Sequence, residues 1–276
     1  VVSLAMNYFT RPPATAPAIA TAPATPLPSP PPTPSGQAAP ATASASATAS
    51  ATAPATSSPN WSNYAWGGDY HRLLKKRLKA LLAVLQKAYP GINGIACVDT
   101  SPVMEKVWAR QAGLGWQGKH TCLITRELGS WVFLGELLLD VALPPDEPFG
   151  DDLCGSCSAC LEACPTGALT APYELDSRRC ISYLNIEHRG DFTPGTDLNG
   201  WLYGCDICQQ VCPWNEKFAR ESMEPAFRPR EFISSWSLDR WQRLSAEEWD
   251  KLFTGSPARR TKYDGLMRNI EMVGGK

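Results

Sequence analysis

Cysteines with the spacing of iron–sulfur ligands are concentrated between Cys154 and Cys212. The first run follows the pattern C-x2-C-x2-C-x3-C-P, the spacing of bacterial two-cluster ferredoxins, and consists of Cys154, Cys157, Cys160, Cys164 and Pro165. The second run repeats the last three cysteines and the proline, and consists of Cys205, Cys208, Cys212 and Pro213. Cys180 is the candidate for the first ligand that the second run lacks. Thiolates in this pattern indicate one-electron chemistry.

The spacing also predicts how these thiolates divide between two [4Fe–4S] clusters. Three cysteines at two-residue gaps can wrap one cluster, whereas the fourth starts a helix that points away and ligates the other cluster. The first cluster is then held by Cys154, Cys157, Cys160 and Cys212. The second is held by Cys164, Cys180, Cys205 and Cys208.

Two other interpretations of the same cysteines are two structural zinc sites and four disulfides. Zinc sites usually show two C-x2-C pairs rather than this run, so the spacing favours iron–sulfur clusters. Cys97 and Cys122 lie outside the pattern. We expect both to be small, buried, apolar side chains.

The composition restricts the class of protein without identifying it. The 276 residues are enough for one large or two modest domains. Lys plus Arg is 26 and Asp plus Glu is 27, so the overall charge indicates no partner. Ten cysteines without a signal peptide indicate a reducing, cytoplasmic location, where thiolates stay available to metal. No apolar run approaches about 18 residues, so we expect no membrane-spanning helix.

The beginning of the chain has an unusual organisation. Residues 1–8 are typical of a strand from inside a fold, so we expect a sequence that is incomplete at its N-terminus. From Pro12 to Asn60 there is no charged residue, and this stretch holds 13 of the 25 prolines between Ala, Thr and Ser repeats. Such a segment cannot bury enough apolar surface to offset its ordering entropy. We therefore predict a disordered insertion over residues 11–60.

The elements that position the cysteines can be predicted from periodicity and turn residues. Leucines at three- and four-residue steps predict a helix over residues 69–88, whose basic face is either solvated or a nucleic-acid surface. A strand follows over 94–98, and Pro102 at a first helical position predicts a helix over 103–112. Residues 121–125 and 131–139 resemble a strand pair joined by a turn. A capping box at Ser245 signals one of several helices after the cysteines.

Two clusters beside a separate α/β region imply delivery of electrons to an acceptor in that region, because a bare ferredoxin needs only the cluster domain. A glycine-rich loop over residues 113–120 ends in Lys119 and His120, which are candidates for cofactor, substrate or surface groups. Asp99, directly after the strand over 94–98, has an ordinary structural interpretation as a helix N-cap ahead of Pro102.

Together, these residues resemble the epoxyqueuosine reductase family, which completes queuosine formation in tRNA. The resemblance covers residues 1–8 and nearly all of 69–269, and it rests on more than the cysteines. The matching pieces are Val98–Glu105, Ala112–His120, Phe133–Leu137, Ala171–Leu184, Tyr203–Cys208, Cys212–Asn215 and Gly255–Arg260 with Arg268 and Asn269. The chain departs from the family by the Pro/Ala/Thr insertion and by the absence of several dozen residues before residue 1.

The resemblance implies a cobalamin cofactor beside the two [4Fe–4S] clusters and an external low-potential electron donor. It implies reduction of the epoxide of epoxyqueuosine, at the wobble position of tRNA, to the alkene of queuosine. It also assigns Asp99 as the proton donor, a role for which we expect burial under an apolar cofactor face to raise its pKa. The cobalamin contacts that it implies are Asp99, Leu123, Leu134 and Ser182.

The basic segments acquire a use if tRNA is the substrate, because phosphates attract Lys and Arg. The candidates are Lys75, Lys76, Arg259, Arg260 and Arg268. We expect no membrane partner and a monomeric chain. The alternatives are a corrinoid enzyme of the reductive dehalogenase kind and a non-enzymatic, ferredoxin-type electron-transfer protein.

The resulting prediction is an α+β chain in four parts. A cobalamin-binding α/β domain spans residues 1–10 and 61–150, and the insertion over 11–60 interrupts it. A ferredoxin-like domain with two [4Fe–4S] clusters spans 151–216. A small, basic, helical region spans 217–276.

Overall fold

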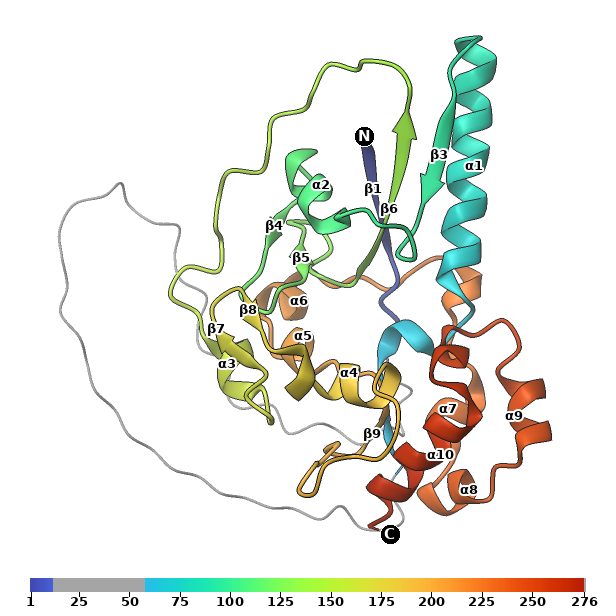
Figure 1. Ribbon diagram of the computed structural model, residues 1–276. Helices are drawn as coiled ribbons and strands as arrows, with labels where there is room; N and C mark the ends of the chain where they lie inside the picture. The colour runs from blue at the N-terminus through green and yellow to red at the C-terminus, as the bar shows by residue number, and fades with distance from the viewer. Residues whose placement is uncertain (12–57, 276) are drawn as a thin grey trace, which may run out of the picture.

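The computed structural model describes residues 1–11 and 58–275, and its centre is a three-stranded antiparallel sheet (Figure 1). Its strands are β1 (Val2–Asn7), β3 (Gly94–Cys97) and β6 (Val132–Leu139), in the order β1-β6-β3. β6 is central, and its Leu137 lies opposite Val2 on one side and Ala96 on the other. All three strands were predicted from the sequence. The predicted insertion over residues 11–60 lies outside the described residues except at its two ends.

Helix α1 (Tyr70–Ala88) covers one face of this sheet. Asp69 caps its N-terminus by accepting a hydrogen bond from the His71 amide. The predicted leucine stripe faces the sheet, where Leu74 and Leu78 are buried against Phe133 and Leu137. The helix prediction over residues 69–88 is therefore confirmed, since burial of this stripe ties α1 to the sheet.

Helix α2 (Glu105–Gln111) lies on the opposite side of the sheet from α1 (Figure 1). The predicted helix over 103–112 exists but starts later, because its N-cap is Met104 and Pro102 lies in the preceding turn. The prediction that Pro102 occupies a first helical position is wrong. The displaced start matters because it leaves Asp99 in a loop of its own rather than at a helix cap.

The predicted strand pair over 121–125 and 131–139 is not formed. β5 (Leu123–Ile124) pairs instead with β4 (Trp116–Gln117), and β6 joins the central sheet. An isolated bridge joins Thr125 to Gly129, which lies in the predicted turn and not in the second predicted strand. The reason is that the glycine-rich loop folds back on itself. An added Cβ at Gly115 would lie 2.0 Å from the Ile124 carbonyl oxygen, so only glycine permits this approach.

Short elements carry the cysteines. The first run leads into α3 (Ala159–Ala163), which is followed by the hairpin of β7 (Leu169–Ala171) and β8 (Glu174–Leu175). Cys180 precedes α4 (Ile181–Ile186), and the second run spans α5 (Ile207–Gln210) and the start of α6 (Pro213–Phe218). Pro213 occupies the first turn of α6, where its missing N–H costs nothing. α3 contacts α5, so the two cysteine runs lie together.

The C-terminal region is helical, as predicted. Its helices are α7 (Glu231–Ser235), α8 (Leu238–Gln242), α9 (Ala246–Leu252) and α10 (Lys262–Val273). The Ser245 hydroxyl accepts a hydrogen bond from the Glu248 amide at 3.1 Å, which confirms this cap of α9. No helix in the described part of the chain is long and apolar enough to cross a membrane.

A second apolar core joins the C-terminal helices to the rest of the molecule. β2 (Asn60–Trp61) pairs in parallel with β9 (Trp201–Tyr203), and Trp61 stacks on Tyr203 and Phe253. Because β2 begins at Asn60, the predicted insertion ends too late by at least one residue. The residues after the insertion therefore pack against the cysteine-bearing region and the C-terminal helices, and not only against the central sheet.

Candidate electron- and proton-transfer site

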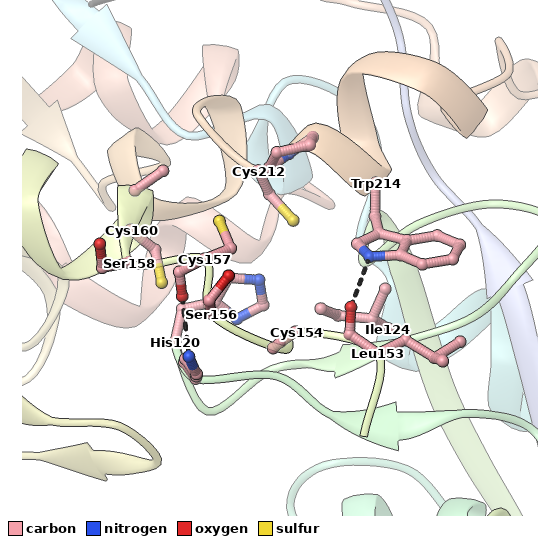
Figure 2. Close-up of a pocket in the computed structure, with 13 residues that line it drawn as sticks. His120, Ile124, Leu153, Cys154, Ser156, Cys157, Ser158, Cys160, Cys212 and Trp214 are labelled. Carbon is pink, nitrogen blue, oxygen red and sulfur yellow. Dashed lines mark hydrogen bonds between the residues drawn. The ribbon is translucent and has the colours of Figure 1, made fainter. Parts of the chain in front are cut away.

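The four thiols predicted for the first cluster line one cavity (Figure 2). Its volume is about 140 Å³, and its walls include Cys154, Cys157, Cys160 and Cys212. Burial raises the pKa of Cys160 to about 12, and the three other thiols add to the shift. A positively charged centre in this cavity would convert such thiols to thiolates, which is the form that binds metal.

The thiols predicted for the second cluster also lie close enough to affect one another. Burial raises the pKa of Cys205, and the nearby Cys180 and Cys164 raise it further. Burial likewise raises the pKa of Cys208, with contributions from Cys205 and Cys180. The structure thus brings together the members of each predicted set, although they come from segments far apart in the chain.

The two alternative interpretations of the cysteines, disulfides and structural zinc sites, can be compared with the structure. All ten cysteines are free thiols, so the disulfide interpretation is wrong. Within residues 1–11 and 58–275, no three Cys, His, Asp or Glu side chains form a group that could hold a single metal ion.

The glycine-rich loop contacts the first cysteine run. Lys119 Nζ donates to the carbonyl oxygens of Gly155 at 2.6 Å and Cys157 at 2.9 Å. The Trp116 indole N–H donates to Cys154 Sγ at 3.5 Å. These contacts make Lys119 a support for the cysteine loop, a role that was not among those expected from the sequence.

A larger cavity, of about 710 Å³, contains the predicted proton donor. Asp99 and Ser182 line it together with Cys180, a thiol of the second set. Tyr70, His71 and Arg260 also line it. The cavity therefore places a carboxylate, a phenol and an imidazole beside a predicted cluster ligand, so that protons and electrons can be supplied to one place.

Asp99 is held in an unusual backbone conformation. Its φ is +52°, in the left-handed region that non-glycine residues seldom adopt. The Asp99 amide donates to Glu105 Oε1 at 2.5 Å, at the start of α2. Asp99 is not the cap of α2, so the ordinary interpretation of this residue as a helix N-cap is wrong. A strained residue at the wall of a cavity favours a functional role.

The Asp99 carboxylate accepts two hydrogen bonds from α1. The Tyr70 hydroxyl donates at 2.8 Å and His71 Nε2 lies 2.9 Å away, both at Asp99 Oδ2. His71 Nδ1 lies 2.8 Å from Asp69 Oδ1, so the imidazole bridges two carboxylates. Hydrogen bonds to Asp69 and Asp99 raise the pKa of His71 to about 9.

The same contacts lower the pKa of Asp99, chiefly through the hydrogen bond from His71. The raised pKa that we expected for Asp99 is therefore not found in this structure. At neutral pH the proton of the pair resides on His71, and the Asp99 carboxylate is ionised. Asp99 is 55% exposed at its side chain, which leaves room for a proton acceptor to approach.

Sequence reasoning missed His71. The only local signal is its position two residues after the Asp69 cap, where an imidazole can turn back toward the cap carboxylate. Its contact with Asp99 crosses 28 residues of sequence and depends on how α1 crosses the sheet. No spacing rule predicts such a contact.

The His71 bridge predicts a defined pH dependence of stability. Because its folded pKa of about 9 exceeds its ordinary value of 6.5, its stabilising contribution is complete below about pH 6.5 and is lost as the pH rises through about 9. We expect the difference in unfolding free energy between the parent chain and His71→Gln to shrink over that interval. Urea unfolding from about pH 6 to about pH 10 measures it. A constant difference would contradict the bridge.

Glu105 is supported in turn by a buried carboxyl on β6. Glu136 has no solvent exposure, and burial raises its pKa to about 8, with Glu105 adding to the shift. Glu136 is therefore protonated at neutral pH, and its neighbour Glu105 accepts the Asp99 amide hydrogen bond. The Glu105 carboxylate therefore fixes the turn that carries Asp99.

The structure places only part of the predicted cobalamin contacts at the larger cavity. Asp99 and Ser182 share the larger cavity, whereas Leu123 and Leu134 are not among the residues that line it. β3 ends at Cys97, opposite Glu136, so residues 132–135 of β6 have a strand neighbour only on the β1 side within the described residues. The main chain at Leu134 therefore borders an open sheet edge close to the Asp99 turn.

The predicted tRNA-contacting residues have different environments. Lys75 and Lys76 are exposed on α1. Arg259 pairs with Asp250 at 2.8 Å, and Arg260 forms an ion pair with Glu187 at 2.8 Å. Arg268 donates to the carbonyl oxygens of Leu184, His188 and Gly190. The Arg268 guanidinium therefore holds α4 and its following loop, a role that sequence reasoning did not anticipate.

Comparisons with known proteins match nearly the whole described chain. The family model "4Fe-4S double cluster binding domain" matches residues 153–215, and the model "Epoxyqueuosine reductase QueG, DUF1730" matches residues 40–100. The epoxyqueuosine reductase of Synechococcus sp. (strain RCC307) is 44% identical over 218 residues, which cover 79% of this chain and 68% of the relative.

Solved structures of epoxyqueuosine reductases have a similar fold. One, with an epoxyqueuosine-modified tRNA-Tyr stem loop, has a TM-score of 0.74 and 32% identity over 79% of this chain. Another, from Bacillus subtilis, is described with an aspartate catalytic loop swung out of the active site, and has a TM-score of 0.74 and 30% identity over 81% of this chain. This chain spans 58% and 59% of the lengths of those two chains.

Proposed function

Because this chain belongs to the epoxyqueuosine reductase family, a family of oxidoreductases, we propose that it reduces epoxyqueuosine in tRNA to queuosine. The observation that carries the proposal is the larger cavity, where the Asp99 carboxylate and the Cys180 thiol face the same space. A proton source and a predicted cluster ligand at one place match the needs of a reductive deoxygenation.

The balance of the reaction defines what the site must supply. Conversion of an epoxide to an alkene consumes two electrons and two protons, and the oxygen leaves as water. Electrons would enter one at a time from an external low-potential donor through the two clusters. Cobalamin, when bound, would supply a strongly reducing cobalt centre at the epoxide. The residues of this chain must orient the substrate and deliver the protons.

Asp99, Tyr70 and His71 have the contacts needed for proton delivery. The oxygen of the opened epoxide becomes a strong base, so a donor within hydrogen-bond reach can protonate it. Asp99 Oδ2 lies 2.9 Å from His71 Nε2, which holds the proton, and both side chains line the cavity. The proposed path runs from His71 Nε2 to Asp99 Oδ2 and then to the substrate oxygen. The relative described with a swung-out aspartate loop supports a catalytic role for the Asp99 turn.

The cluster ligands proposed are the two sets derived from the spacing. The match to a double-cluster domain over residues 153–215 contains every one of them. The first set lines its own cavity, whereas Cys180 of the second set lines the larger cavity together with Asp99. In this proposal the second cluster is therefore the one next to the substrate.

The residues around the larger cavity fit a corrin cofactor in two respects. The cavity volume of about 710 Å³ is in the range of cofactor sites. The open edge of β6 at residues 132–135 offers main-chain groups to the amide side chains of a corrin. We propose that Asp99 and Ser182 contact cobalamin from the cavity, and that Leu123 and Leu134 contact it through main-chain atoms.

The proposed tRNA surface combines α1 and the turn before α10. Lys75 and Lys76 are free to approach phosphates, whereas Arg259 and Arg260 would exchange their present carboxylate partners for phosphate. A relative solved with a modified tRNA stem loop supports tRNA as the substrate class. Arg268 would act on binding only by holding the loop after α4.

Binding of tRNA is expected to weaken as salt rises, because each Lys–phosphate contact releases counterions. For the variant Lys75→Ala/Lys76→Ala, we expect the slope of log affinity against log salt to fall in magnitude by about one to two units. The matched control is Lys87→Ala, at the other end of the same helix. Fluorescence titration of a stem loop at several salt concentrations measures the slopes. An affinity of the parent chain that ignores salt would contradict the proposed surface.

The function itself is tested by turnover. Anaerobically reconstituted protein, supplied with cobalamin and a chemical reductant, is expected to convert epoxyqueuosine in tRNA to queuosine, as detected by nucleoside mass spectrometry. Release of chloride from chlorinated aromatics, without conversion of tRNA, would favour the dehalogenase alternative. Reducible clusters without either activity would favour an electron-transfer protein.

A further inference from the structure

His120 is buried in the wall of the cavity between the first four thiols (Figure 2). It is 3% exposed, and its Nδ1 accepts a hydrogen bond from the Cys122 amide at 3.2 Å. A ring nitrogen that accepts a hydrogen bond carries no proton, so the proton of the ring is on Nε2. Nε2 is buried and has no hydrogen-bond partner among the described residues. Buried N–H groups are rarely left without a partner in native proteins.

Trp116 supplies a second N–H on the same side. Its side chain is 2% exposed, and its indole N–H donates to Cys154 Sγ at 3.5 Å. Both donors come from the glycine-rich loop and not from the cysteine runs. The loop therefore directs one buried N–H group at a thiol of the first set and carries a second, on His120, in the wall of the cavity that these thiols line. Lys119, between them in the sequence, holds the cysteine backbone.

We propose that Trp116 and His120 are hydrogen-bond donors that raise the reduction potential of the first cluster. Trp116 acts through Cys154 Sγ, and His120 acts through a sulfur atom of the bound cluster. Reduction adds negative charge to the cluster, so N–H groups directed at its sulfur atoms stabilise the reduced form more than the oxidised form. The inference rests on the proposed cluster set of Cys154, Cys157, Cys160 and Cys212.

The test is a redox titration of the reconstituted protein, followed by electron paramagnetic resonance of the reduced clusters. His120→Asn keeps an acceptor for the Cys122 amide and removes the Nε2 proton. Trp116→Phe removes the indole N–H. For each variant we expect one of the two midpoint potentials to fall, by about a tenfold change in the reduction equilibrium, or about 59 mV for one electron. The other midpoint should stay in place.

Two further variants make the result specific. Trp214 lines the same cavity, but its indole N–H donates to the Leu153 carbonyl oxygen at 3.2 Å, so Trp214→Phe should leave both midpoints unchanged. His120→Gln retains an N–H near the position of Nε2 and should lie closer to the parent chain than His120→Asn does.

Unchanged midpoints in both His120→Asn and Trp116→Phe would overturn the inference, as would an equal shift in Trp214→Phe. If His120→Asn loses the first cluster altogether, the midpoint potential of Trp116→Phe decides the test: a fall supports the inference, and an unchanged value overturns it. A parent chain that binds no iron would instead refute the proposed cluster sites, and iron analysis before the titration separates the two failures.

Discussion

Asp99→Ala is expected to abolish conversion of epoxyqueuosine in tRNA while leaving both clusters in place. Loss of a positioned proton donor typically lowers a rate by about 10²- to 10⁴-fold, and the reaction must protonate the leaving oxygen. Asp99 lies outside the two thiol sets, so its removal changes no proposed cluster ligand. Single-turnover kinetics with excess protein measure the chemical step, and iron analysis with absorption spectra confirms the clusters.

Two control variants separate the loss of the Asp99 carboxyl proton from other effects of removing a carboxylate. Asp99→Asn keeps an acceptor for Tyr70 and His71 but has no carboxyl proton, so we expect it to be nearly as slow as Asp99→Ala. Asp140→Ala removes an exposed carboxylate at the far end of β6, where it contacts only Asn93 among the described residues, and should retain the parent rate. Full turnover by Asp99→Asn would refute the donor role.

Cys160→Ala is expected to remove one of the two clusters. Cys160 is buried among Cys154, Cys157 and Cys212, so no other thiol of the described chain lies ready to replace it in that cavity. We expect about half of the iron and sulfide to be lost, because the second set shares no ligand with the first. Electron transfer to the substrate should fail as well, if electrons pass through both clusters.

The matched control is Cys97→Ala, which removes another buried thiol that belongs to neither set. This variant should retain all the iron. Cys208→Ala should lose the other half, and its remaining paramagnetic signal should differ from that of Cys160→Ala. Equal iron contents in Cys160→Ala and Cys97→Ala would contradict the proposed ligand sets.

The sequence predicted which cysteines lie close together, because cluster ligation imposes a spacing on the chain itself. A run with two-residue gaps constrains its own loop. The prediction that the fourth cysteine starts a helix is confirmed for Cys212, which precedes α6, but is wrong for Cys164, which ends α3. The structure accordingly brings Cys212 to the first run and Cys180 to the second. Periodicity was equally informative for α1, since one leucine stripe along many turns has a single way to be buried.

Other features depended on contacts between distant segments. β5 pairs with β4 rather than with β6 because the glycine-rich loop brings its backbone against Ile124. The Asp99 turn is held by Glu105 and His71, from two helices on opposite faces of the sheet. Neither arrangement leaves a periodic trace, so sequence reasoning misassigned the first and missed His71 in the second.

The proposed function depends on iron–sulfur clusters that deliver electrons to a corrin beside Asp99. Anaerobic reconstitution with iron, sulfide and cobalamin, followed by metal analysis and absorption spectra of the repurified protein, tests this most directly. We predict two [4Fe–4S] clusters and one corrin per chain, with the corrin spectrum bleached on reduction only when the clusters are present. Protein that retains zinc in these thiols, or clusters that leave the corrin in the flow-through, would contradict it.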